Sequence, residues 1–186
     1  MAWRDSHRRW GGVSQLFHWL TALLVLGLLV AGFAAAEFIT DIGTRFRIIQ
    51  WHKSFGLLVL ALTALRLGWR WFSPGPAAPG DLKPYERALA RLSHAGLYTL
   101  LIAMPLAGWL SVSTATRGIP TEVFGLFTLP RLLAPNAGHH RFFETAHAVF
   151  AYLLVALLLL HVAAALHHHW RRKDDVLRRM LPNKMK

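Results

Sequence analysis

Long apolar stretches alternate with short polar connectors along the whole chain. Four of the stretches have roughly the 20 helical residues that a bilayer core requires, and they cover approximately residues 16–38, 48–72, 92–112 and 145–167. The connector 73–84 is rich in proline and glycine and is predicted to be a loop, whereas the longer connector 114–144 has room for short interfacial helices. The pattern predicts an all-α fold: a four-helix transmembrane bundle that forms one membrane-embedded domain over residues 1–186.

The basic residues are distributed unevenly between the two sides of these stretches. The chain has 21 Lys and Arg against 9 Asp and Glu, a formal net charge of +12. Fifteen of the basic residues lie in the two terminal tails and around the connector between the second and third stretches, and six lie on the other side. Because basic loops remain in the cytoplasm, we predict that both termini are cytoplasmic. Basic residues that gather at the ends of apolar stretches indicate contact with anionic lipid, and no nucleic acid partner is expected.

The chain contains no cysteine. This excludes disulfides, iron–sulfur clusters, thiolate metal sites and haem attached covalently through cysteine.

Five histidines lie within or at the ends of the apolar stretches, where ionisable side chains are costly and indicate function. They are His18, His52, His94, His147 and His161. His147 and His161 share the fourth stretch, so their fourteen-residue spacing separates them by roughly 21 Å on nearly the same helix face. His18 is level with His161 at the cytoplasmic depth, and His52 is level with His147 at the periplasmic depth.

Two histidine pairs at two depths are an arrangement with which a helix bundle holds six-coordinate haem iron. A zinc or di-iron site would need carboxylates as well, and no Asp or Glu lies within an apolar core. His94 is at the same depth as His18 and His161, so histidine spacing alone leaves His18 and His94 as alternatives. Arg66 and Arg70 also lie at this depth, where they could bind haem propionates or reach lipid phosphate.

Four stretches around these histidines form a recognisable set, together with LRRMLP near the C-terminus. They are SQLFHWLTALL (14–24), WHKSFGLLVL (51–60), RLSHAGLYTLLIAMPLAGW (91–109) and HAVFAYLLVALLLLHVAAALHHHW (147–170). The set resembles the bacterial cytochrome b561 family. The resemblance covers nearly the whole chain and preserves both the helix order and the fourteen-residue histidine spacing.

The resemblance implies a b-type cytochrome of the bacterial inner membrane with two non-covalent haems. Carried over motif by motif, the iron ligands fall on His18, His52, His147 and His161, and His94 matches a family histidine that does not bind iron. Some members oxidise superoxide at the periplasmic face and reduce ubiquinone, which would make this chain an oxidoreductase. The alternative is a haem-carrying relay subunit that connects a partner dehydrogenase or hydrogenase to the quinone pool.

A surplus of positive charge on the expected periplasmic side would steer superoxide toward the haem. This side has six basic and four acidic residues, a surplus of only two positive charges. Its net charge alone therefore does not indicate that it attracts superoxide. Lys53 directly follows His52 and is the candidate catalytic residue, either at a haem propionate or at the substrate entrance. An interface anchor is the alternative for this lysine.

Overall fold

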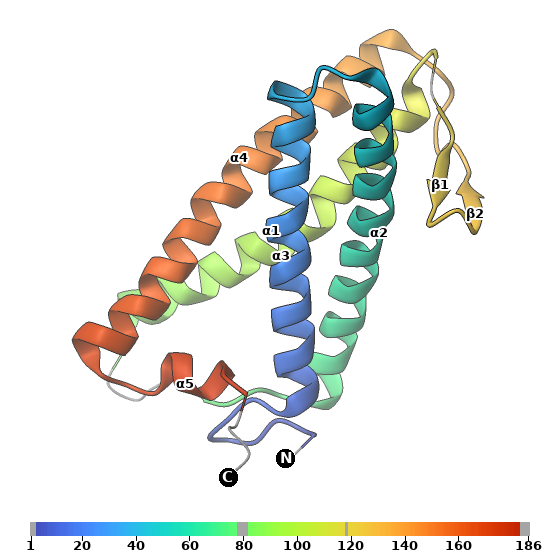
Figure 1. Ribbon diagram of the computed structural model, residues 1–186. Helices are drawn as coiled ribbons and strands as arrows, with labels where there is room; N and C mark the ends of the chain where they lie inside the picture. Colours follow the sequence, from blue (N-terminus) through green and yellow to red (C-terminus); the bar gives the residue numbers. More distant parts are fainter. Residues whose placement is uncertain (1–2, 78–81, 118, 183–186) are drawn as a thin grey trace.

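Four long helices dominate the computed structural model, which describes residues 3–77, 82–117 and 119–182 (Figure 1). They are α1 (Gly12–Glu37), α2 (Ile42–Phe72), α3 (Pro84–Thr114) and α4 (Ala137–His167). Within the described residues these four helices are long and apolar enough to cross a membrane, which confirms the predicted fold class.

Each helix begins four to eight residues before the apolar stretch that predicted it. In α2, α3 and α4 the residues that start the helix, polar caps or a first-position proline, lie outside the apolar stretch. The Asp41 carboxylate accepts a hydrogen bond from the Thr44 N–H at 2.7 Å, and the Asn136 side chain accepts one from the His139 N–H at 2.9 Å. Pro84 occupies the first position of α3, where its missing N–H costs nothing. Hydropathy therefore marked the apolar part of each helix rather than the whole helix.

A β-hairpin joins α3 to α4, and the expectation of interfacial helices in this connector is wrong for its described residues. Strands β1 (Thr121–Val123) and β2 (Phe127–Leu129) pair antiparallel. Phe124 and Gly125 at the turn both have positive φ, 51° and 70°, as tight hairpin turns require. The hairpin lies beside α2 (Figure 1), and we call this end of the bundle the hairpin end.

The opposite end carries the start of α1 and the last described residues, and we call it the terminal end (Figure 1). Here the π-helical segment η1 (His168–Arg172) and the short helix α5 (Val176–Met180) follow α4. Two side chains of α1 bind the end of α5: Gln15 donates to the Arg179 carbonyl at 3.3 Å and Trp19 to the Met180 carbonyl at 3.0 Å. The C-terminal segment thus connects the end of α4 with the start of α1.

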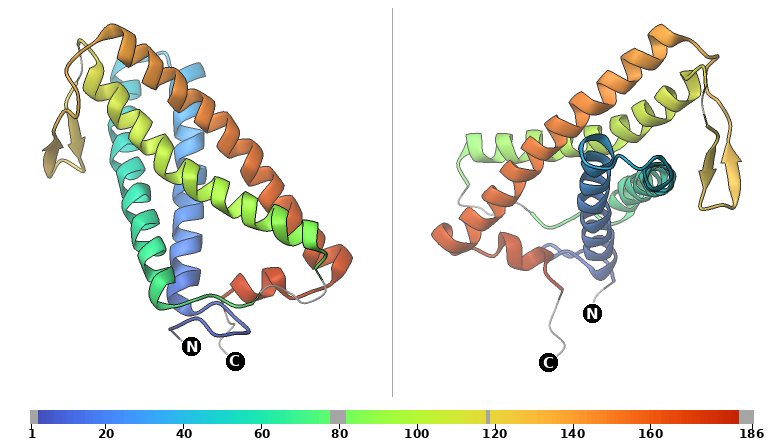
Figure 2. Two further views of the ribbon diagram at one scale, coloured as in Figure 1. Left: turned by 180° about the vertical axis from the view of Figure 1, so that it is seen from behind. Right: turned by 45° about the horizontal axis from the view of Figure 1, so that its top comes forward.

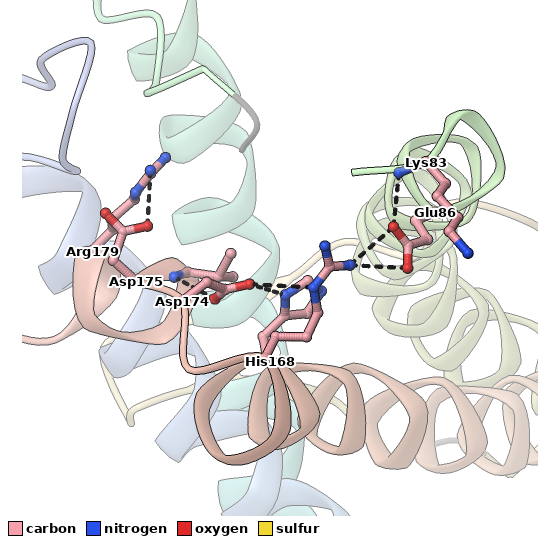
Figure 3. Close-up of polar contacts among 8 residues, drawn as sticks. Lys83, Glu86, His168, Asp174, Asp175 and Arg179 are labelled. Atoms are coloured by element: carbon pink, nitrogen blue, oxygen red, sulfur yellow. Dashed lines mark hydrogen bonds and ion pairs between the residues drawn. The ribbon is translucent and has the colours of Figure 1, made fainter. Parts of the chain in front are cut away.

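Charged side chains join the same segment to α3 (Figure 3). The Arg172 guanidinium donates to both oxygens of Glu86, at 2.9 and 3.0 Å. His168 Nδ1 lies 2.5 Å from an oxygen of Asp174, six residues further along the chain. These contacts fix the path of the chain after α4.

The helices pack as two pairs, α1 with α2 and α3 with α4, and the two pairs are inclined to each other (Figure 2). All four helices contribute to one apolar cluster: Val25, Leu29, Val59, Leu100 and Leu154. Leu154, only 2% exposed, lies midway between His147 and His161 in sequence. An apolar layer therefore separates the two ends of the bundle. Many other large apolar side chains of the helices are exposed, as expected of a surface that faces lipid.

Candidate functional site

His52 of α2 and His147 of α4 face each other at the hairpin end, and we call them the hairpin-end pair. The centres of their rings are 6.2 Å apart, with the ring planes at 70°. Both side chains are half-buried. The structure thus brings together the two histidines that spacing assigned to one depth.

The two imidazoles of this pair are held differently. His147 Nδ1 lies 2.9 Å from the Met104 carbonyl of α3. Because a carbonyl only accepts, Nδ1 carries the proton and Nε2 keeps its lone pair for a metal. His52 Nδ1 makes no hydrogen bond of normal geometry, although the backbone of Leu28 in α1 interacts with this ring.

An apolar pocket lies beside the hairpin-end pair. Its lining comes from all four helices and includes His52, Gly56, Val59, Met104, His147 and Leu154. A side chain added at Gly56 would meet no atom within 4 Å, so α2 leaves room at this point. An apolar pocket with an imidazole from each of two facing helices fits a b-type haem.

Three histidines lie together at the terminal end, and we call them the terminal-end cluster: His18 of α1, His94 of α3 and His161 of α4. The ring centres of His18 and His161 are 6.3 Å apart at 64°. His94 is closer to His161, at 5.5 Å and 75°. His94 is exposed, whereas His18 and His161 are half-buried.

Ring separation distinguishes these contacts. Two metal–imidazole bonds of about 2 Å each, together with the distance from each nitrogen to its ring centre, put the ring centres roughly 6 Å apart. The separations of 6.2 Å for His52–His147 and 6.3 Å for His18–His161 fit an iron between the rings. At 5.5 Å the His94–His161 contact is shorter than this arrangement needs.

Two arginines and a tyrosine surround the terminal-end cluster. Arg66 Nη2 lies 3.4 Å from His18 Nδ1, and the Arg66 guanidinium lies 5.4 Å from the centre of the Tyr98 ring. Arg70 donates to the Tyr98 hydroxyl at 3.4 Å and lies 5.8 Å from the ring of Trp10. Arg66 therefore lies beside His18, and Arg70 lies at the same end of the bundle on the Tyr98 hydroxyl.

Lys53 lies on α2 between His52 and the buried Ser54, which bonds to the hairpin. Its side chain is half-buried and makes no hydrogen bond or ion pair with the residues that the structure describes. It is the basic residue next in sequence to the hairpin-end pair.

Sequence reasoning missed three groups at these sites. Tyr98 carried a usable signal, because it falls four residues after His94 on the same helix face. No sequence signal marked the Met104 carbonyl as a partner of His147, since every residue has a backbone carbonyl. Gly108, which faces His147 across the α3–α4 contact, resembled ordinary small-residue packing between membrane helices.

The four helices are long and apolar enough to span a membrane, and imidazole pairs lie on facing helices at both ends of the bundle. These two features are typical of helix-bundle membrane proteins that bind haem. A family model described as prokaryotic cytochrome b561 matches residues 9–183. The chain is also 36% identical over 181 residues to cytochrome b561 homolog 2 of Escherichia coli (strain K12). The aligned region covers 97% of this chain and 95% of that protein. The chain belongs to the prokaryotic cytochrome b561 family.

This membership confirms the resemblance seen in the sequence. It identifies the chain as a multi-pass protein of the bacterial inner membrane that carries b-type haem and transfers electrons.

Proposed function

We propose that the chain is a di-haem cytochrome that passes single electrons between its two ends. His52 and His147 hold one haem, and His18 and His161 hold the other. The observation that carries this proposal is the near-equal ring separation of the two pairs, 6.2 and 6.3 Å, at opposite ends of one bundle. Bound haem supplies the one-electron chemistry through its iron.

The residues of the chain have separate parts in this function. The four imidazoles bind as neutral ligands, and the Met104 carbonyl keeps His147 in the tautomer that offers Nε2. The apolar layer around Leu154 excludes water between the two pairs. Low dielectric there strengthens the effect of every nearby charge on the sites.

Arg66 is proposed to bind a propionate of the terminal-end haem. A guanidinium only donates, so its contact with His18 requires a lone pair on Nδ1. A neutral His18 that binds iron through Nε2 carries its proton on Nδ1, where it would face the arginine donor. Arg66 must then turn to an anionic acceptor, and a carboxylate is the partner that its planar donors fit best. Arg70 is proposed to have the same role from the other side of Tyr98.

Superoxide is proposed as the electron donor at the hairpin end and ubiquinone as the acceptor. Two superoxide anions lose one electron each and leave as dioxygen, while one ubiquinone takes up two electrons and two protons to give ubiquinol. Lys53 is the proposed catalytic residue because it adds a positive charge directly beside His52. A cation at this point would attract a small anion.

Stopped-flow reduction of the oxidised protein by superoxide tests this step. The rate is expected to fall with rising ionic strength, because screening shortens to roughly 10 Å at about 0.1 M salt. Lys53→Gln should lower the rate, whereas Lys83→Gln at the other end of the bundle should not. If superoxide reduces neither haem rapidly while a partner protein does, the chain is the relay subunit of a dehydrogenase or hydrogenase.

Both termini are proposed to be cytoplasmic, which makes the hairpin end periplasmic. The support is the fifteen-to-six distribution of Lys and Arg. A C-terminal alkaline phosphatase fusion should be inactive and a C-terminal fluorescent protein fusion bright. Strong phosphatase activity of the fusion would reverse the proposed orientation.

A further inference from the structure

We propose that Gly108 of α3 is a positioning residue for the hairpin-end pair. Its missing side chain lets the His147 ring lie against α3, where Nδ1–H reaches the Met104 carbonyl. The inference rests on the proposed function, because it assumes that His147 binds iron through Nε2.

The close approach of the His147 ring to α3 carries the argument. A Cβ added at Gly108 would lie 3.1 Å from His147 Nδ1 and 3.2 Å from Cε1. Both atoms belong to a rigid ring that the bond to Met104 holds in place, so no flexible chain end can move aside. A methyl group would shift the ring by a few tenths of an ångström and lengthen the 2.9 Å hydrogen bond.

This bond has an electronic effect beyond its contribution to packing. A ligand imidazole that donates its other N–H to a carbonyl is fixed in one tautomer and is a more basic ligand. A more basic ligand favours the oxidised, more positive iron. Since the pocket beside the pair is apolar, water offers no ready replacement for a lost carbonyl.

The geometry of α3 makes the Met104 carbonyl available to His147. In a regular helix this carbonyl accepts from the N–H of residue 108 and retains a second lone pair. Pro105 lies next to it and lacks an N–H, so the carbonyl one turn earlier, at Leu101, has no helical donor, while α3 continues to Thr114. Gly108 thus has two roles. Its N–H is the helical partner of the Met104 carbonyl, and its missing side chain leaves space for the His147 ring, which donates to the same carbonyl.

His52 provides an internal comparison. Gly32 of α1 lies against it in the same way, since an added Cβ would be 3.1 Å from Cε1 and 3.6 Å from Nδ1. However, His52 Nδ1 makes no hydrogen bond of normal geometry. A methyl group at Gly32 would displace a ring without breaking such a bond.

The test is a redox titration of Gly108→Ala, with Gly96→Ala as the matched control. Gly96 lies on the same helix and also faces α4, but its added Cβ would meet only Cδ2 of Leu157, the end of a flexible side chain, at 2.9 Å. In Gly108→Ala the hairpin-end haem should bind about 10- to 100-fold more weakly, and its midpoint potential should rise. The other haem should not change. His52→Ala, which keeps only the other haem, assigns the two titration waves.

Several outcomes are decisive. If Gly108→Ala matches Gly96→Ala in both haem affinity and potential, Gly108 has no positioning role. If His147→Ala retains two haems, the proposed ligand assignment fails instead, so the two failures can be told apart. Should Gly108→Ala fail to accumulate, ¹⁵N NMR of the wild-type protein with labelled histidine tests the same bond. A protonated, hydrogen-bonded Nδ1 at His147 supports the proposal, and an unbonded Nδ1 overturns it.

Discussion

The hairpin-end pair and the terminal-end cluster share a ring separation and differ in almost everything around it. At the hairpin end, His52 and His147 lie beside an apolar pocket, and the assigned hydrogen bond goes to a backbone carbonyl. At the terminal end, His18 and His161 are joined by a third imidazole, two guanidinium groups and a phenol.

The comparison indicates that the imidazole pairs bind the haems, whereas the groups around each pair set the haem potential. The near-equal ring separations, 6.3 and 6.2 Å, are compatible with the proposed iron at either end and do not distinguish the two ends. Positive charge near an iron favours its reduced state, so Arg66 and Arg70 should raise the potential of the terminal-end haem. Electrons would then move from the hairpin end to the terminal end, the direction that the proposed function requires.

The largest expected effect is the loss of one whole haem. His52→Ala and His147→Ala should each leave about one haem per chain, because an iron with one protein imidazole is held poorly. His18→Ala should do the same at the terminal end. Pyridine haemochrome assays on the purified variants count the haem.

His94→Ala is the matched control, since it removes an imidazole from the terminal-end cluster without removing a proposed ligand. It should retain two haems. Loss of a haem in His94→Ala together with full retention in His18→Ala would exchange the roles of these two residues.

A smaller effect is expected when Arg66 is replaced. Arg66→Gln should weaken binding of the terminal-end haem by about 10- to 100-fold, the equivalent of one hydrogen bond to a charged group. It should also lower the potential of this haem through the lost positive charge. Redox titration and haem retention on dilution measure both quantities. The hairpin-end haem of the same variant is the control, and equal shifts of both haems would argue against a local role.

Two buried serines allow each end to be loosened separately. Ser54, 2% exposed, accepts from the Phe124 N–H at 3.0 Å and donates to the Glu122 carbonyl at 3.1 Å. Ser54→Ala should cost about 1–3 kcal/mol by leaving buried hairpin groups without partners. Hydrogen exchange should therefore rise in the hairpin, residues 121–129, and remain unchanged at the terminal end.

The corresponding change at the other end is Ser73→Ala. Ser73, 3% exposed, accepts from the Asp5 N–H at 2.9 Å. Its replacement should increase exchange near Asp5 and leave the hairpin protected. If both variants loosen both ends, the two ends do not behave independently.

The smallest expected effect concerns acid at the start of α2. Hydrogen bonds from Thr44 hold the pKa of Asp41 below its ordinary value. The stabilisation is complete above that ordinary value and is lost as pH falls through the lowered pKa. Hydrogen exchange in the first turn of α2 should therefore rise at low pH. Asp41→Asn, which keeps a capping acceptor, should remove this pH dependence. The same dependence in the variant would mean that another group titrates.

The four helices and the pairing of histidines by depth were predictable because both depend on spacing along a helix. Fourteen residues separate His147 from His161, and helical rise converts this number into depth. Spacing could not decide between His18 and His94, since both reach the same depth. The resemblance to cytochrome b561 and the ring separations favour His18.

What could not be predicted depends on backbone groups and on contacts between distant residues. The hairpin consists of two three-residue strands, too short for a clear alternating pattern. The Met104 carbonyl has no counterpart in the amino-acid sequence. Gly108 acquires its meaning only when α3 and α4 are packed together.

The central claim is that one chain holds two b-type haems in unlike surroundings. It is tested most directly by a potentiometric titration of the purified protein, followed by its reduced-minus-oxidised visible spectrum and combined with a haem count. The account predicts about two haems per chain and two separate one-electron waves, of which the higher-potential wave is lost in His18→Ala and the lower in His147→Ala. A single haem per chain, or two haems that both survive His147→Ala, would contradict it.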